Sequence, residues 1–362
     1  MTAKSPEFAR IALIQEILGA ARGDAGHAGR VLVGIGDDAA VLAGGADPLV
    51  WTVDCAVEGV HFRRDLMSLE DIGYRATMAA ASDLAAMGAT PVGLLASLVL
   101  PPSVRDADLR ALVAGQRAAC DAIGAAIIGG NLARGGEISV TTTALGSAPA
   151  PLCRDGARDG DELALAGPVG LAATGLRLLE ARPRRRGRAG DAGGAARAQA
   201  QTRALALAIE AFRRPLARID AGVRARGVAR AAIDISDGLA ADLGHLARAS
   251  GVCALLEADA LLGAELIEAA ALAGADPLEL ALHGGEDYAL LVAGPAVGAL
   301  PGFVRVGRCA PRAEGTPEVG LLGPDGRVTP VAGGGFDHFA RRRSRSGASA
   351  GRGRKAGSKR PG

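Results

Sequence analysis

Aliphatic runs of strand length recur along the whole chain, and stretches with helical periodicity separate them. The longest run, residues 94–100, is far shorter than a membrane-spanning helix requires. Glycine supplies 53 of the 362 residues and falls mainly in short turns between the runs, without the triplet repeat of a collagen. Apolar residues make up 49% of the chain and aromatic residues only 2%, so we expect a large, aliphatic core. The alternation predicts a mixed α/β fold.

The chain length predicts about two domains, at roughly 150 residues for each. We place the boundary in the proline-rich segment 149–151, which gives an N-terminal domain of residues 1–150 and a C-terminal domain of residues 151–339. An Arg/Gly/Ala-rich stretch at 183–201 predicts a flexible insert in the second domain. Residues 340–362 lack apolar periodicity and predict a disordered tail.

Capping and periodicity signals predict the individual elements. Ser5-Pro6 is typical of a helix start, and Ser68 with Asp71 forms a capping-box pattern. We expect helices at 6–18, 69–88, 103–123, 168–181 and 238–249. We expect strands at 31–35, 49–53, 93–100, 125–128, 138–142, 162–166, 231–235, 253–256, 288–292 and 304–306, with a hairpin turn at 323–326.

Several protein classes are excluded by residue counts. The five cysteines are widely spaced and form no CxxC pair, which argues against a disulfide framework or a thiolate zinc site and favours the cytoplasm. Glu7, Arg10 and Glu16 interrupt the first apolar stretch, so we expect neither a signal peptide nor a membrane span there. Lysine occurs only at 4, 355 and 359, which leaves the body without a Walker A lysine or a Schiff-base lysine.

The formal charge of +2 hides an asymmetry between body and tail. Residues 340–362 carry nine of the 41 basic residues and no acid, so the rest of the chain has a net charge of −7 against its 39 acidic residues. A basic tail on an acidic body leaves open a nucleic-acid-binding role, although the tail has no aromatic side chains on which bases could stack.

The segment 34–39 (GIGDDA) follows a predicted strand and matches the dinucleotide-binding pattern G-x-G-x-x-A. Asp37 and Asp38 would repel a pyrophosphate at this position, and no clear helix follows to offer its N-terminal amides. An acidic, glycine-rich turn can instead hold a divalent cation that itself binds phosphate. A turn that binds no ligand is the alternative.

Further carboxylates stand at the ends of other predicted elements. Asp54 follows an aliphatic strand, Asp83 lies on the apolar face of a helix, and Asp234 and Asp237 flank a strand end. Each has a structural alternative, because a buried Asp can be salt-bridged and residues 236 and 237 can cap the next helix. Glycine-rich loops at 129–131 and 284–287 add an Asn and a Glu. The set predicts several Mg²⁺ ions bridging polyphosphate oxygens, as phosphoryl transfer requires where no P-loop exists.

Eight motifs resemble those of the thiamine-monophosphate kinases in sequence and in order along the chain. They are GIGDDAAVL, VDCAVEGVHF, ASDLAAMGATP, IIGGN, LCRDGARDGD, IDISDGLAADLGH, HGGEDY and GFDHF. The resemblance runs from about Phe8 to Phe339 and excludes the insert and the tail. The segments IDISDGL and SDLAAMGA are also similar to a wider superfamily of aminoimidazole ribonucleotide synthetase, selenophosphate synthetase and hydrogenase maturation proteins. VEGVHF and GFDHF favour the kinase.

The resemblance implies an aminoimidazole ribonucleotide synthetase-like fold of two α/β domains. In this fold the N-terminal sheets of two subunits pair into a β-barrel and form a homodimer, and ATP lies in a cleft near the domain junction. The implied reaction passes the γ-phosphoryl group of ATP directly and in line to thiamine monophosphate. The products are thiamine diphosphate and ADP, and the reaction is the last step of thiamine diphosphate biosynthesis.

Matching the motifs position by position, the resemblance implies Mg²⁺ ligands at Asp38, Thr52, Asp54, Asp83, Asn131, Asp234 and Asp237. It implies nucleotide contacts at Gly130, Asn131, Arg154 and Ser236. It implies acceptor contacts at His61, Glu286 and Phe336. Of these residues, Asp54, Asp237 and Arg154 are expected to act on the transferred phosphoryl group.

Physical chemistry agrees with these roles, because donor and acceptor are both anions and repel each other until cations neutralise their oxygens. The acceptor phosphate is already ionised at neutral pH, so no strong general base is needed. Phe336 is the expected stacking partner of the cationic, planar acceptor. Val53 and Asn131 depart from the pattern: Val53 lacks a hydroxyl that the family often has, and a neutral Asn replaces a frequent Asp.

Two other functions remain open from the sequence. One is another ATP-using member of the superfamily, such as a cyclo-ligase or a selenophosphate synthetase, although no cysteine stands in the N-terminal glycine-rich loop where a selenophosphate synthetase is expected to carry one. The other is a nucleic-acid-binding protein acting through its basic tail, which would show a steep salt dependence.

Overall fold

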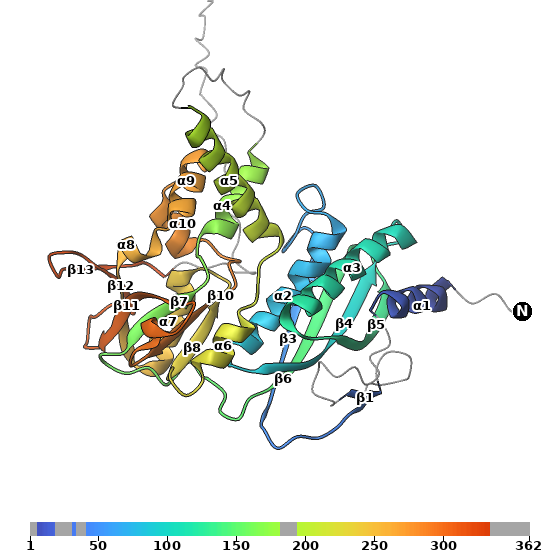
Figure 1. The fold of residues 1–362 in the computed structure, drawn as a ribbon, viewed down its shortest axis with the longest axis horizontal. Coiled ribbons are helices and arrows are strands. Elements are labelled where there is room, and N and C mark those ends of the chain that lie inside the picture. Colours follow the sequence, from blue (N-terminus) through green and yellow to red (C-terminus); the bar gives the residue numbers. More distant parts are fainter. Residues whose placement is uncertain (1–5, 19–30, 34–40, 182–193, 334–362) are drawn as a thin grey trace, which may run out of the picture.

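Two lobes lie side by side and meet along the helix α2 (Leu69–Ala86), as Figure 1 shows. The structure is a computed structural model, and it describes residues 6–18, 31–33, 41–181 and 194–333. The first lobe is built on a four-stranded sheet and the second on a seven-stranded sheet, with a two-stranded sheet beside the first.

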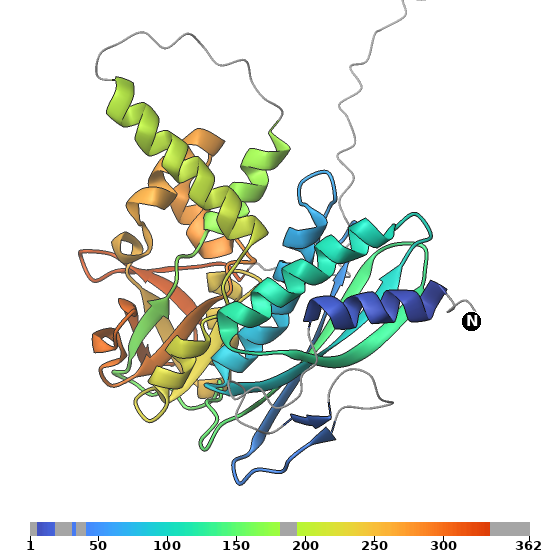
Figure 2. The ribbon, with the colours of Figure 1, turned by 45° about the vertical axis from the view of Figure 1, so that its right-hand side comes forward.

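The four-stranded sheet has the order β3-β6-β4-β5, in which β4 and β5 are parallel and the other pairs antiparallel. Helices α2 and α3 cover one face, and α1 packs against α3 (Figure 2). The elements of this lobe are α1 (Pro6–Leu18), β1 (Val31–Val33), β2 (Val41–Leu42), β3 (Leu49–Val57), α2, β4 (Thr90–Leu100), α3 (Asp106–Ile123), β5 (Ile127–Arg134) and β6 (Ser139–Ser147).

The residues of β3 alternate between the two faces of this sheet. Val50 is buried beneath the helices, and Thr52 and Asp54 share its side of the strand. On the other face Trp51 and Val53 are 71% and 63% exposed. The described chain therefore leaves this second face of the sheet uncovered.

Helices α2 and α3 approach each other backbone to backbone, because glycines stand where they cross. A Cβ atom on Gly73 would overlap the carbonyl of Leu112, and one on Gly115 would overlap that of Glu70. The capping box predicted for α2 is confirmed, since the Asp71 amide donates to the Ser68 hydroxyl (3.1 Å) and the Ser68 amide to the Asp71 carboxylate (3.2 Å).

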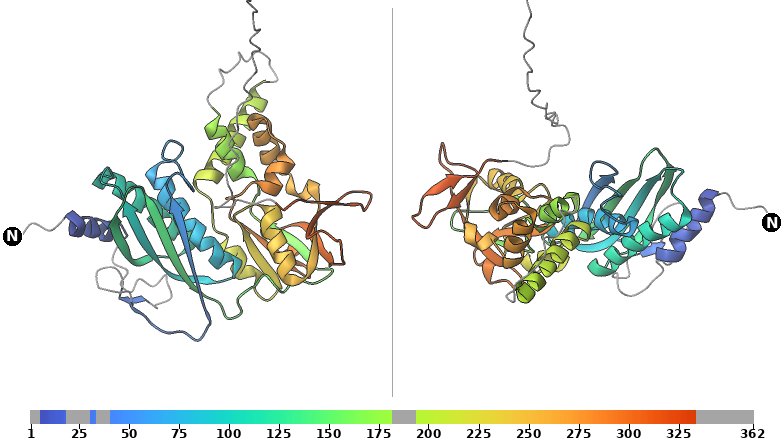
Figure 3. Two further views of the ribbon diagram at one scale, coloured as in Figure 1. Left: turned by 180° about the vertical axis from the view of Figure 1, so that it is seen from behind. Right: turned by 90° about the horizontal axis from the view of Figure 1, so that it is seen from above.

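The seven-stranded sheet has the order β13-β12-β9-β11-β7-β10-β8 and is antiparallel except for the pair β9 and β12. Figure 3 shows this lobe from behind and from above. Its elements are β7 (Glu162–Ala166), α4 (Leu171–Glu180), α5 (Gly194–Arg213), α6 (Ile219–Ala225), β8 (Ala231–Ile235), α7 (Leu239–Ser250), β9 (Val252–Leu256), α8 (Ala258–Leu261), α9 (Ala264–Ala273), α10 (Pro277–His283), β10 (Ala289–Gly294), the 3₁₀ turn η1 (Val297–Ala299), β11 (Val304–Pro311), β12 (Val319–Leu322) and β13 (Val328–Pro330).

Both faces of the seven-stranded sheet are covered by helices. Successive side chains along each strand point to opposite faces and so belong to two separate apolar clusters. Ile233 and Ile235 of β8 belong to the cluster beneath α4, α5, α7, α9 and α10. Ala232 of the same strand packs with Ala86 of α2 and Ala221 of α6 on the opposite face. Asp234 shares the side of Ala232, so β8 presents this carboxylate toward the first lobe.

Most predicted elements are confirmed, and two expectations are corrected. Residues 129–131 were expected in a loop after a strand, but they continue β5, which pairs with β4 through residue 134. Residues 194–201 were expected in a flexible insert, but they form the first turns of α5, because their alanine-rich sequence has high helix propensity. Residues 182–193 and the tail lie outside the described residues.

The hairpin turn at 323–326 is confirmed, since it joins β12 to β13 with Gly326 at φ 77°. Within the described ranges, no helix combines the length and the apolar character needed to cross a membrane.

Candidate active site

Two carboxylates, one from each lobe, meet where α2 crosses the end of β8. Asp83 is half-buried on α2 and accepts a hydrogen bond of 2.5 Å from the Thr52 hydroxyl of β3. Asp234 is 7% exposed on β8 and accepts one of 2.8 Å from the Ser82 hydroxyl of α2. Consecutive residues of one helix thus contact both sheets, and this brings Thr52, Asp83 and Asp234 together as the sequence predicts.

The two carboxylates raise the cost of each other's charge. Burial raises the pKa of Asp83, the Thr52 hydrogen bond lowers it, and the charge of Asp54 raises it again. Burial and then the charge of Asp83 raise the pKa of Asp234, which reaches about 6. The positive charge of Arg154 lowers the pKa of both carboxyls, so this predicted nucleotide ligand lies near the pair.

The backbone of the turn after β8 is fixed by hydrogen bonds to a carboxylate that was not predicted from the sequence. Asp242 of α7 accepts hydrogen bonds from the backbone amides of Ser236 (2.9 Å) and Asp237 (3.0 Å). Burial, with the charge of Asp234 next, raises the pKa of Asp242 to about 7. Helix α7 begins after Gly238 without a side-chain cap, so the side chains of Ser236 and Asp237 do not cap it in this structure. An acid one turn inside a helix that starts without a side-chain cap was the available signal.

A loop of the second lobe, residues 283–288, packs against this turn. The amide of Glu286 donates to the carbonyl of Ser236 (2.7 Å), and the amide of Tyr288 donates to that of Ile235 (2.8 Å). Glu286 also forms an ion pair with Arg75 of α2. The structure therefore places the predicted acceptor ligand Glu286 beside Ser236, a predicted nucleotide ligand.

Other predicted residues take different positions. The Nδ1 atom of His61 accepts a hydrogen bond from the Val57 amide (3.0 Å), and the adjacent Phe62 packs in one cluster with Ala172 and Phe212 of the second lobe. Asp38 and Phe336 lie outside the described residues.

Gly130 and Asn131 lie within β5, on consecutive rows of the four-stranded sheet. Gly130 is in register with Ala96, whose backbone a Cβ atom at position 130 would overlap. Gly130 is on the row of Asp54, whereas Asn131 is on the next row and belongs to the face opposite Asp54. Asn131 is exposed, and the structure does not bring it beside the carboxylates of its own chain.

The chemistry of these side chains fits Mg²⁺. Within the described part of the chain, no three His, Cys, Asp or Glu side chains come close enough to enclose a metal ion by themselves. Mg²⁺ is usually bound by one or two carboxylates together with substrate phosphates, and an all-protein cage is the exception. Two carboxylates that repel each other, each already bonded to a hydroxyl, match that arrangement.

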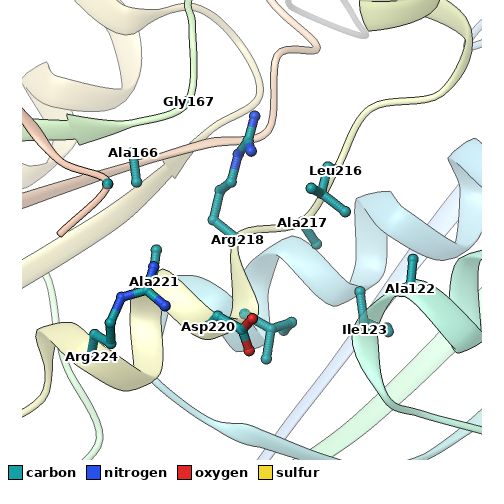
Figure 4. A pocket seen from close by; sticks show the side chains of 12 residues that line it. Ala122, Ile123, Ala166, Gly167, Leu216, Ala217, Arg218, Asp220, Ala221 and Arg224 are labelled. Atoms are coloured by element: carbon teal, nitrogen blue, oxygen red, sulfur yellow. The ribbon is translucent and has the colours of Figure 1, made fainter.

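A separate pocket of about 270 Å³ lies between the end of β7 and the start of α6 (Figure 4). Arg218 and Arg224 line it together with alanine and glycine residues, and its lining includes none of the predicted site residues. Neither arginine has a carboxylate partner among the residues that the structure describes. Asp220 lines the same pocket, so its charge is mixed, and nothing in it identifies a ligand.

Comparison with known proteins agrees with the geometry. Residues 36–148 match the family "AIR synthase related protein, N-terminal domain". Over 262 residues the chain is 35% identical to the thiamine-monophosphate kinase of Aquifex aeolicus, a match that covers 72% of this chain and 80% of that protein. The chain belongs to the thiamine-monophosphate kinase family.

Solved structures of this family and of a more distant protein share the fold. The structure of AaThiL in complex with AMPPCP and TMP is 30% identical, covers 94% of this chain and 99% of its own, and superimposes with a TM-score of 0.69. The hydrogenase maturation protein HypE in complex with ATP is 18% identical, covers 82% and 88%, and has a TM-score of 0.61, which is a likeness of fold. The aminoimidazole ribonucleotide synthetase-like fold expected from the sequence is thereby confirmed.

Proposed function

We propose that this chain transfers the γ-phosphoryl group of ATP directly to thiamine monophosphate, giving thiamine diphosphate and ADP. The observation that carries the proposal is the pair Asp83 and Asp234, brought from two lobes to one point through the hydrogen bonds of Thr52 and Ser82. Burial raises the pKa of both carboxyls, and the charge of Asp83 raises that of Asp234 further. Family membership supports the choice of substrates, because AaThiL was solved with AMPPCP and TMP. The reaction would complete thiamine diphosphate biosynthesis.

The residues divide into three tasks. Asp54, Asp83, Asp234 and Asp237, with Thr52, would hold Mg²⁺, which when bound neutralises phosphate oxygens and stabilises charge in the transition state. Arg154 would add positive charge at the same phosphates, and Ser236 and Gly130 would contact the nucleotide. Glu286 and His61 would orient the acceptor. Metal roles for Asp38 and Asn131 and stacking by Phe336 remain part of the proposal.

The test is direct. Purified protein with ATP, Mg²⁺ and thiamine monophosphate should form thiamine diphosphate and ADP in equal amounts, separated by chromatography. The Asp237→Asn variant should lose most of its turnover but unfold at a temperature similar to that of the wild type. The reason is that the Asp237 carboxylate, in the turn after β8, would bind metal and does not pack in the core. Hydrolysis of ATP without thiamine diphosphate would contradict the proposal.

We also propose that the chain acts as a homodimer in the cytoplasm, with its domain boundary between β6 and β7. The open face of the first sheet, which includes Trp51 and Val53, supports the dimer. The five cysteines, none of them in a disulfide, support the location.

A further inference from the structure

Arg75 of α2 is a buried cation with no role yet assigned to it, either in the packing of the fold or in the binding of phosphate. Its side chain is 6% exposed, and its guanidinium contacts three groups of the second lobe. It forms an ion pair with Glu286, donates a hydrogen bond to the carbonyl of Phe212, and lies 4.7 Å from the centroid of the Phe212 ring. Burial lowers the pKa of Arg75, and the nearby Tyr288 and Asp287 raise it.

The loop that carries Glu286 is strained. Glu286 has φ 71° and Tyr288 φ 48°, a left-handed conformation that non-glycine residues seldom adopt. Such strain persists only where the surroundings hold the backbone in place, and it is concentrated at functional sites. Contacts with neighbouring elements must therefore hold the backbone of this loop in place.

Residues 286–288 of this loop have three attachments in the described structure, and two come from the second lobe itself. The backbone amides of Glu286 and Tyr288 bond to the end of β8. The Asp287 carboxylate accepts the amides of Gly170 (2.6 Å) and Ala172 (3.0 Å) at the start of α4. The third attachment is Arg75, and it is the one that comes from the first lobe.

The Arg75 attachment also differs from the other two in what it holds. The bonds to β8 and α4 fix backbone atoms and the Asp287 side chain, whereas Arg75 contacts the carboxylate of Glu286. The Glu286 side chain is 37% exposed, so one side of it lies on buried Arg75 and the other remains open to a ligand. The Nη2 atom of Arg75 contacts one oxygen of this carboxylate, and a buried, planar guanidinium has less freedom to move than an ammonium group on a flexible stem.

We propose that Arg75 is a positioning residue for the acceptor: it orients the Glu286 carboxylate from beneath and ties the acceptor loop to α2, the helix that also carries Ser82 and Asp83. This inference rests on the proposed function and adds to it a residue that contacts neither substrate. It assigns Arg75 an effect on the affinity for thiamine monophosphate and little effect on that for ATP.

A double-mutant cycle on Arg75 and Glu286 tests the proposal. Arg75→Met keeps the stem of the side chain, and Glu286 is exposed enough to remain solvated without its partner, so we expect this variant to fold. It should raise the KM for thiamine monophosphate about ten- to hundredfold, the range typical of residues that orient a ligand-binding group. The KM for ATP should change less than about twofold, and Arg75→Lys should recover part of the loss.

The cycle separates positioning from a general structural role. In a Glu286→Gln background, Arg75→Met should raise the KM for thiamine monophosphate little further, because residues that act as a unit are not additive. Arg214→Met is the matched control, since Arg214 also pairs with a carboxylate (Glu70, 3.1 Å) and lies 4.4 Å from the Tyr74 ring centroid. It should leave both KM values unchanged.

The outcomes distinguish the two proposals. No thiamine diphosphate from the wild-type chain would overturn the proposed function, and this inference with it. An active wild type with additive effects in the cycle, or an equal rise in both KM values, would overturn this inference alone. If Arg75→Met does not fold, the same comparisons on Arg75→Lys decide the matter.

Discussion

Each carboxylate at the centre of the candidate site carries a hydroxyl partner from a neighbouring element. The Thr52 hydroxyl donates to Asp83 and the Ser82 hydroxyl donates to Asp234. A hydrogen bond to the ionised form favours that form, so these two donors offset part of the cost that burial and mutual repulsion impose. The hydroxyls thus keep both carboxylates oriented and nearer to the charged state in which they would bind a cation.

Replacing Thr52 by Val tests this role. The variant removes the donor to Asp83 at nearly constant volume, so the pKa of Asp83 should rise and its affinity for Mg²⁺ should fall. We expect the Mg²⁺ concentration for half-maximal rate to rise at least about ten- to hundredfold, because the variant removes both the donor to Asp83 and a proposed Mg²⁺ ligand. Thr52→Ser keeps the hydroxyl and should behave like the wild type. Equal Mg²⁺ dependence in the Val and Ser variants would contradict the prediction.

The raised pKa of Asp234 predicts a specific pH dependence of stability. With Mg²⁺ removed by a chelator, the folded chain keeps a proton on Asp234 up to a pH of about 6. The unfolded chain loses this proton near the ordinary pKa of 3.8. The free energy of unfolding should therefore fall as the pH rises from about 4 to about 6, by up to about 3 kcal/mol at roughly 1.4 kcal/mol for each pKa unit.

Asp234→Asn should remove this part of the pH dependence, which urea unfolding at a series of pH values measures. Asp220→Asn, on an exposed part of α6, serves as the control and should keep the wild-type slope. An Asp234→Asn variant with the same slope as the wild type between pH 4 and 6 would contradict the prediction.

Sequence reasoning reached the residues of the site that stand in local motifs. Thr52, Asp83 and Asp234 were predicted, and the structure brings them together. Asp242 was missed although its contact is local, because an acid inside a helix has no fixed partner in the sequence pattern. Arg75 was missed because it contacts a loop far along the chain. A charged residue on the otherwise apolar face of α2 was the only local signal of Arg75.

At the level of elements, α2 depends on the close approach of α3. The glycines at 73 and 115 let the two backbones touch, and this packing fixes the face of α2 that reaches β8. Gly73→Ala should reduce the free energy of unfolding by about 1–3 kcal/mol, the usual cost of overpacking. Helix propensity alone would favour alanine by about 1 kcal/mol.

Gly244→Ala is the matched control, because Gly244 is also helical but a Cβ there would meet nothing closer than 3.7 Å. It should stabilise the chain by up to about 1 kcal/mol in the same urea titration. If both substitutions raise the free energy of unfolding, α2 and α3 can move apart at no cost in stability. The close contact between the two helices would then contribute nothing to stability.

The strands were easier to predict than the helices of the second lobe. Strands such as β7 and β8 are short and mostly buried, each with a single acidic residue among aliphatic ones, and the sequence shows their ends clearly. Helix α5 (Gly194–Arg213) was not predicted, and its first turns were assigned to the insert because a composition of Ala, Arg and Gly also describes a linker. Strand β5 was cut short because glycines at 129 and 130 signal a turn, whereas here they permit close pairing with β4.

At the scale of the whole molecule, the first lobe has a sheet with an apolar face that the described chain leaves open. Trp51, Val53 and Leu49 are 71%, 63% and 57% exposed on this face. A contiguous exposed apolar patch is typical of a protein–protein interface. This is the surface on which the proposed homodimer depends.

Trp51→Glu should convert a dimer into a monomer, because it would bury a charge at the centre of the contact. Light scattering after size-exclusion chromatography measures the mass directly. Ile267→Glu, at an exposed apolar position on α9, is the control and should keep the wild-type mass. A wild-type chain that elutes as a monomer, or a Trp51→Glu variant that remains a dimer, would contradict the prediction.

Helix α2 fixes the spacing between two contacts with the second lobe, one with the acceptor loop and one with strand β8. Arg75 and Ser82 are separated by about two turns, so they lie on one side of the helix and roughly 10 Å apart along its axis. One meets the acceptor loop and the other meets the end of β8. Deleting a single residue between them would rotate one contact away from the other by about 100°. The acceptor loop and the end of β8 are therefore held at a distance set by the helical repeat, and a change of length in this short segment could not be absorbed by repacking either lobe alone.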